Sequence, residues 1–211
     1  MFHWLLVLAF AAAYVTGDEE SWLLAHSLFG YTVLGLVGFR LIWGVVGTRY
    51  ARFASFAFGP AQVARYLGSL LTPRPRHYTG HNPAGSWAIY ALLALAAISG
   101  FTGWLALEKI GGEWLEDLHE GAANLMLAIV LVHIAGAVVS SWLHGENLVR
   151  SMIDGHKRGD PEQGLRGPLT GVGVLLIAAV LALWTAALRG DLPSLTQPAA
   201  ERQHEEGDDD D

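Results

Sequence analysis

Four histidines lie within or at the edges of apolar segments: His3, His26, His119 and His133. An imidazole in hydrocarbon is costly unless its nitrogens have partners, so ionisable groups in such segments are candidates for function. A hydrogen bond between helices explains a single histidine equally well. A matched set of imidazoles, however, is suited to binding a metal centre, because the neutral ring is a common metal ligand. The set therefore raises the question of which elements hold these rings.

The composition predicts an integral membrane protein, because 52% of the 211 residues are hydrophobic and only 16% are charged. The last four of five apolar segments are long enough to cross a hydrocarbon core of about 30 Å, which takes roughly 20 helical residues. The five segments are about Phe2–Thr16, Trp22–Val46, Ser86–Leu107, Gly121–Leu143 and Leu169–Leu188. The sequence has no cysteine, which excludes thiolate metal sites, iron–sulfur clusters and covalently attached haem.

The basic residues predict an orientation. They gather between the second and third segments and between the fourth and fifth: Arg49, Arg52, Arg65, Arg74, Arg76, Arg150, Lys157, Arg158 and Arg166. The positive-inside rule therefore places the N-terminus and both basic loops in the cytoplasm. The acidic loops and the C-terminal tail, which ends in the solvated run 205–211, are then outside.

The spacing of the histidines predicts two pairs. At about 100° and 1.5 Å per residue, His119 and His133 share a helix face and stand about 21 Å apart. His26 lies in the first turn of the second span and so matches His119 in depth, whereas His3 matches His133. The pairs His26 with His119 and His3 with His133 are each suited to ligate a haem iron from two sides. Two stacked b-type haems would then cross most of the membrane.

Arg40 lies fourteen residues after His26, on the same face and near the depth of the second haem. We expect it to pair with a haem propionate; the alternative is an arginine at a helix end that extends to the membrane surface. Several glycines would let a flat macrocycle approach the backbone, although small-residue helix packing explains each of them equally well: Gly30, Gly35, Gly38, Gly44, Gly121 and Gly136.

At these residues the sequence resembles the bacterial cytochrome b561 family, which includes the b-type cytochrome subunits of nickel–iron hydrogenases. The resemblance covers roughly residues 1–158 and rests on FHWLLVLAF (2–10), AHSLFGYTVLGLVGFRLIW (25–43), HNPAG (81–85), LHEGAANLMLAIVLVHIAGA (118–137) and ENLVRSMIDGHKR (146–158). It implies a four-helix membrane core in which two b haems exchange electrons between quinol and a redox partner. The histidine at the start of span one, the histidine in span two and the two histidines of span four match the family's ligand pattern.

The fold class expected is an all-α integral membrane protein: a four-helix transmembrane bundle holding two b haems, plus a fifth C-terminal transmembrane helix. Residues 1–158 would form this dihaem core, 159–168 a cytoplasmic linker, 169–188 the additional helix and 189–211 an acidic disordered tail. Family members usually carry a basic segment before the first histidine. Because this chain starts two residues before His3, a truncated N-terminus is expected, which bears on the second haem.

The function predicted is transmembrane electron transfer between the quinone pool and a redox partner such as a c-type cytochrome, in the respiratory chain of a bacterial inner membrane. Direct quinol oxidation would class the protein as an enzyme. One alternative is a haem-bearing membrane anchor of a hydrogenase-like or dehydrogenase-like complex. Another is a His-lined metal or proton transporter, which would favour acidic residues deep in the spans, where none lies. No nucleic-acid partner is expected.

The loops suggest secondary roles with two interpretations each. An inner polar cluster would bind a quinone headgroup or a propionate, or its HNP segment would simply form a turn: Arg74, His77, His81 and Asn82. An acidic outer loop would attract a basic cytochrome c, or would simply be solvated: Glu108, Glu113, Glu116, Asp117 and Glu120. A short interfacial helix is expected after Pro60.

Overall fold

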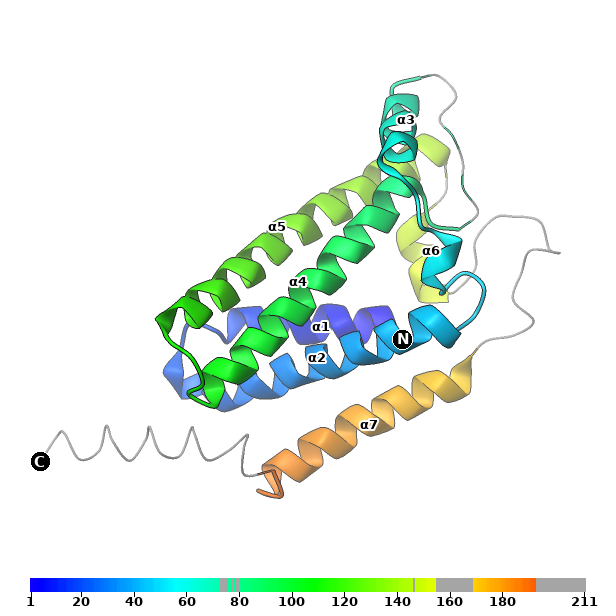
Figure 1. Ribbon diagram of the computed structural model, residues 1–211. Helices are drawn as coiled ribbons and strands as arrows, with labels where there is room; N and C mark the ends of the chain where they lie inside the picture. Colours follow the sequence, from blue (N-terminus) through cyan, green and yellow to red (C-terminus); the bar gives the residue numbers. More distant parts are fainter. Residues whose placement is uncertain (73–75, 77, 79, 146, 155–168, 193–211) are drawn as a thin grey trace, which may run out of the picture. The chain divides into compact units, whose positions relative to one another are not determined.

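The computed structural model describes residues 1–72, 76, 78, 80–145, 147–154 and 169–192. In chain order (Figure 1) the helices are α1 (Phe2–Val15), α2 (Leu23–Val46), α3 (Pro60–Leu70), α4 (Pro83–Leu107), α5 (Glu113–His144), α6 (Leu148–Asp154) and α7 (Thr170–Leu188). Single 3-10 turns at Glu20–Trp22 and Phe53–Ser55 precede α2 and α3. The described residues contain no strand, so the all-helical class is confirmed.

Four helices, α2, α4, α5 and α7, are long and apolar enough to cross a membrane, with candidate spans of 24, 25, 31 and 19 residues. They are the four segments that the sequence predicted to be long enough. Large apolar side chains on them are exposed, among them Ile42 at 65%, Val132 at 72% and Leu175 at 70%. Such a surface is suited to hydrocarbon, and the chain is a multi-pass membrane protein. Helix α1 is apolar but has only 14 residues.

The helix starts follow from local capping. Asn82 accepts a hydrogen bond from the Gly85 amide at 2.7 Å, and Pro83 occupies the first position of α4, so this helix begins three residues before the predicted segment. Helix α5 begins at Glu113 and not near Gly121. Glu113 and Glu116 lie in its first turn, where carboxylates interact favourably with the helix dipole. The acidic stretch expected as a loop is thus largely helical.

The chain forms two compact units. Unit 1 comprises residues 1–36, 97–121 and 168–211, and unit 2 comprises 37–96 and 122–167. Helices α2, α4 and α5 contribute residues to both. Each unit is described by itself below.

In unit 1, α7 packs on α2 (Figure 1). Leu28 and Ala187 are 5% and 1% exposed and form the centre of this contact. The Trp184 indole donates a hydrogen bond to the Thr32 hydroxyl at 3.0 Å, and its ring lies edge-on to Phe29 at 4.9 Å. An aromatic anchor that also satisfies its N–H fixes α7 along α2.

In unit 2, a short helix is present as α3, where the sequence predicted one; its position at the membrane interface stays a prediction. The Gln62 side chain accepts a hydrogen bond from the Gly59 amide at 2.8 Å, which caps the helix start. Tyr66 is 3% exposed and ties α3 to α5 through a hydrogen bond with Ser140. Burial raises the pKa of the Tyr66 phenol, although the hydrogen bond with Ser140 opposes that shift.

Candidate functional site

The structure brings His26 and His119 together. Their ring centroids are 5.8 Å apart, with ring planes at 79°. His26 is on the first turn of α2 and His119 on the second turn of α5, and both belong to unit 1. The histidines that sequence depth matched therefore meet in the structure.

Each ring of this pair is oriented by a backbone carbonyl. His26 Nδ1 lies 2.8 Å from the Ala13 oxygen at the end of α1, and His119 Nδ1 lies 2.8 Å from the Ser99 oxygen in α4. Because a carbonyl only accepts, both Nδ1 atoms carry the proton and donate it. The lone pair of each ring is then on Nε2, which has no hydrogen-bond partner among the described residues.

This arrangement fits a pair of axial ligands. Histidines that bind a metal usually donate their second ring N–H to a carbonyl or carboxylate, which fixes the tautomer and raises the basicity of the ligand. With their centroids 5.8 Å apart and the lone pairs on Nε2, the two rings would be suited to hold a haem iron, which would supply one-electron chemistry.

His3 and His133 belong to different units, so their pairing stays a prediction. His3 is on the first turn of α1, where its ring lies edge-on to Trp4 at 5.4 Å. His133 lies in the middle of α5 and is half-buried. Within the part of the chain that the structure describes, no group of three or more His, Asp or Glu side chains is placed to hold a metal ion.

Arg40 lies among aromatic rings in unit 2. Its guanidinium carbon is 4.9 Å from the centroid of the Phe53 ring and 5.9 Å from that of Phe56, which is 1% exposed. The Tyr90 hydroxyl donates a hydrogen bond to the Phe53 carbonyl at 3.2 Å and closes the group. We call Arg40, Phe53, Phe56 and Tyr90 the Arg40 cluster.

One nitrogen of Arg40, Nη1, is buried and has no hydrogen-bond partner among the described residues. Cation–π contact stabilises the charge, but it leaves this N–H unsatisfied, which is unfavourable in a buried setting. An anion such as a carboxylate would satisfy it. The observation therefore fits the propionate role expected from the sequence better than a side chain extended into water.

The glycines expected to border a cofactor divide into two groups. A methyl group added at Gly30, Gly38 or Gly136 would meet nothing within 4 Å, and the same holds at Gly35 and Gly121. These positions face open space, and Gly35, Gly121 and Gly136 are exposed. At Gly44, in contrast, an added side chain would collide with the ring of Phe53. Gly44 therefore makes room for the Arg40 cluster.

Two residues of the predicted inner polar cluster, His81 and Asn82, are among the described residues. Asn82 accepts hydrogen bonds from the Gly85 amide at its side chain and from the Ser86 amide and hydroxyl at its backbone, so it acts as a helix cap. The ring of His81 lies 4.7 Å from that of Phe56. Arg74 and His77 lie outside the described residues. For Asn82, the turn role is the one seen.

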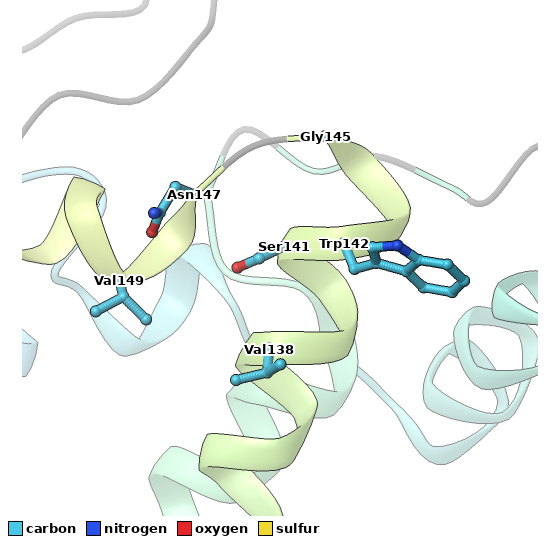
Figure 2. Close-up of a pocket in the computed structure, with 6 residues that line it drawn as sticks. All are labelled: Val138, Ser141, Trp142, Gly145, Asn147 and Val149. Atoms are coloured by element: carbon cyan, nitrogen blue, oxygen red, sulfur yellow. The ribbon is translucent and has the colours of Figure 1, made fainter.

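A cavity of about 480 Å³ lies where α5 joins α6 (Figure 2). Its polar groups have local partners, since the Ser141 hydroxyl donates to the Ala137 carbonyl at 2.7 Å and accepts from the Leu148 amide at 3.1 Å. Asn147 caps α6 by accepting from the Arg150 amide at 2.9 Å. The cavity is lined by Val138, Ser141, Trp142, Gly145, Asn147 and Val149. None of these is a predicted site residue.

Sequence reasoning missed the groups that orient the rings of His26 and His119 and those that surround Arg40. The carbonyls of Ala13 and Ser99 carry no signal in residue type, because every residue has a carbonyl. The 3-10 turn that brings Phe53 over Arg40 was not predicted, since the helix expected in this region begins after Pro60. Aromatic residues shortly after a span that contains an arginine were the available signal for this contact.

Comparisons with known proteins show the family of the chain. The family model described as prokaryotic cytochrome b561 matches residues 1–155. Among curated relatives, a probable Ni/Fe-hydrogenase B-type cytochrome subunit of Cupriavidus necator is 21% identical in an alignment 203 positions long. The alignment covers 74% of this chain and 83% of that protein. The corresponding subunit of Rhodobacter capsulatus is 23% identical, with 74% and 78% covered. No solved structure gives a significant match.

Proposed function

Because the chain belongs to the prokaryotic cytochrome b561 family, we propose that it carries electrons across a bacterial inner membrane through two b-type haems. Haem supplies the one-electron chemistry, and the protein supplies ligation, orientation and a surrounding of low dielectric constant. The observation that carries the proposal is the His26–His119 pair, in which both Nδ1 atoms donate to carbonyls and both Nε2 atoms are left for a metal.

In this proposal His26 and His119 hold the outer haem, and His3 and His133 hold the inner one. Arg40 pairs with a propionate of the inner haem, supported by its buried nitrogen. The N-terminus lies in the cytoplasm, and the acidic C-terminal tail lies outside. Residues 1–158 form the dihaem core, joined by the linker 159–168 to a fifth transmembrane helix.

The redox partners proposed are quinol within the membrane and a basic soluble protein, such as a c-type cytochrome, outside it. Five carboxylates next to His119 in the sequence support the second partner, because all of them are exposed: Glu108, Glu113, Glu116, Asp117 and Glu120. A surface of one charge attracts an oppositely charged partner and raises its association rate. That rate should therefore fall as salt is added.

A second candidate is an electron-transfer subunit attached to a hydrogenase, which the printed names of both relatives favour. Haem content does not separate the two candidates, because both need the same core. Purification under mild detergent separates them. A stoichiometric hydrogenase-like large subunit would support the attached form, and a fully active isolated chain would support the other.

The test of the proposal is a reduced-minus-oxidised optical spectrum and a pyridine haemochrome assay of the purified chain. Two haems b per chain are expected, both reducible by added quinol. Absence of haem b after expression with an adequate haem supply would contradict the proposal. Haem that is reduced by dithionite but not by quinol would contradict the quinone part alone.

A further inference from the structure

Two short segments place the same three groups around the two histidine rings. In Ala13–Gly17 (AYVTG) and in Ser99–Gly103 (SGFTG), a small residue is followed by threonine after three positions and by glycine after four. The carbonyl of the small residue accepts from a histidine Nδ1 at 2.8 Å in both cases, and the Ser99 hydroxyl, which Ala13 lacks, also lies 3.3 Å from His119 Nδ1. The first segment lies at the end of α1 and the second lies within α4. Neither helix contributes His26 or His119.

The threonines make matching hydrogen bonds to these carbonyls. The single hydroxyl proton of Thr16 is shared between the carbonyl of Ala12 at 2.7 Å and, in the longer contact, that of Ala13 at 3.2 Å. The proton of Thr102 is shared in the same way between the carbonyls of Ile98 at 2.8 Å and Ser99 at 3.1 Å. Both threonines are buried, at 7% and 5% exposure. Each histidine therefore shares its carbonyl with a buried hydroxyl.

Both glycines face the histidine rings, but only Gly103 provides space that its ring requires to reach the carbonyl. A carbonyl in a helix points toward the residue four positions later, so a side chain there stands beside the oxygen. A Cβ added at Gly103 would lie 2.7 Å from His119 Cε1 and 2.8 Å from Nδ1, closer than packed atoms approach. At Gly17 the corresponding distances to His26 are 3.5 and 3.6 Å, which is ordinary contact.

The difference between the two glycines has a structural cause. Ala13 is in the last turn of α1, where helix carbonyls lack intrahelical partners, and Gly17 lies beyond the helix end. Ser99 and Gly103 are inside α4, so the His119 ring must approach an intact helix from the side. The requirement for glycine is therefore strict at 103 and mild at 17.

We propose that Thr16–Gly17 and Thr102–Gly103 are two copies of one positioning element, which sets the orientation and basicity of His26 and His119 and thereby the reduction potential of the haem they hold. The inference rests on the proposed function, because it takes these histidines as axial ligands. A stronger bond from Nδ1–H to the carbonyl makes an imidazole more basic, which stabilises the ferric state. Glycine permits this bond, and threonine weakens it by using the same oxygen.

The first test compares Gly103→Ala with Gly100→Ala and Gly17→Ala in a redox titration followed by optical and low-temperature EPR spectra. Gly103→Ala should raise the potential of one haem or remove that haem, with the other haem kept. Gly17→Ala should cause a smaller change in the same direction. Gly100→Ala is the control, because its Cβ would meet only the flexible Leu34 side chain, at 3.0 Å. A wild-type potential and spectrum in Gly103→Ala, or an equal change in Gly100→Ala, would overturn the proposal.

The second test uses Thr102, whose valine variant has nearly the same shape. Thr102→Val removes the hydroxyl that shares the Ser99 carbonyl with His119, so the potential of the same haem should fall, opposite to the change in Gly103→Ala. Thr102→Ser keeps the hydroxyl and should restore the wild-type value. Equal potentials in the valine and serine variants would refute the threonine role. This pair also decides the matter if Gly103→Ala fails to accumulate.

A final comparison separates the inference from its premise. If His119→Ala retains its full haem content, the proposed ligation is wrong. If His119→Ala loses one haem while the Gly103 and Thr102 variants match wild type in potential and EPR spectrum, only the positioning element is wrong.

Discussion

His26 and His119 each have Nδ1 bonded to a backbone carbonyl at 2.8 Å, whereas Arg40 keeps a buried nitrogen without a hydrogen-bond partner in the described chain. In the histidine pair, a directed hydrogen bond holds one nitrogen of each ring. In the Arg40 cluster, aromatic faces support the charge, and one donor has no hydrogen-bond partner in the described chain.

The difference indicates two ways of preparing a site. A ligand must point along one direction, so its orientation is fixed by directed hydrogen bonds. A counter-charge needs only proximity and a low dielectric constant, which aromatic packing provides. Variants that alter the histidine pair should leave the Arg40 cluster unchanged, and variants of the Arg40 cluster should leave the histidine pair unchanged.

The largest effect is expected at the second proposed pair. His3→Ala and His133→Ala should each remove one haem, the same haem in both variants, because a missing axial ligand leaves the iron with an open position. The measurement is haem stoichiometry with a redox titration. Full haem content in His3→Ala would show that His3 is not a ligand. Loss of different haems would refute the pairing of His3 with His133.

Replacement of Arg40 should act on that same haem and more weakly. Arg40→Gln removes the charge, so an ionised propionate loses a charge-assisted bond worth about 1.5–3 kcal/mol, and the potential of the haem falls. Arg40→Lys should retain most of the wild-type potential. Arg49→Gln is the matched control, since Arg49 is exposed and its guanidinium lies by the ring of its neighbour Tyr50. Equal shifts in the Arg40→Gln and Arg49→Gln variants would mean a general charge effect.

The cap of α4 should matter for stability but not for haem binding. Asn82→Ala removes the side-chain acceptor of the Gly85 amide and should cost about 0.5–2 kcal/mol of unfolding free energy. Thermal unfolding in detergent measures this loss, and Asn82→Asp is the control that keeps the cap. A changed haem spectrum in Asn82→Ala at unchanged stability would instead favour a ligand-binding role for this loop.

The smallest effect is expected on α7. Trp184→Phe removes the hydrogen bond to Thr32 and keeps an aromatic ring against Phe29, so the loss of stability should be about 0.5–1.5 kcal/mol. Haem content and both potentials should stay at wild-type values. A shifted potential would show that α7 contributes to the site as well as to packing.

The sequence predicted the parts of this molecule that follow from periodicity and depth. Helix α2 was located to within one residue, and the meeting of His26 with His119 was expected from the direction of the spans alone. Helix α5 was predicted to start too late, because its acidic first turn was interpreted as loop although carboxylates favour a helix N-terminus.

The surroundings of the site were not predictable in the same way. The carbonyls of Ala13 and Ser99 act through backbone atoms that all residues share, so only the threonine and glycine that follow them carried information. The contact of Phe53 with Arg40 depends on a 3-10 turn after α2 and on the space at Gly44. Both depend on tertiary packing, which no local pattern specifies.

His26 and His119 are proposed to hold one haem between them. Redox titration of the wild type and of the His26→Ala and His119→Ala variants, followed in the optical spectrum, tests it most directly. Two components are predicted for the wild type, and each variant should lack the same one while it keeps the other. Loss of different components, or retention of both in either variant, would contradict the account.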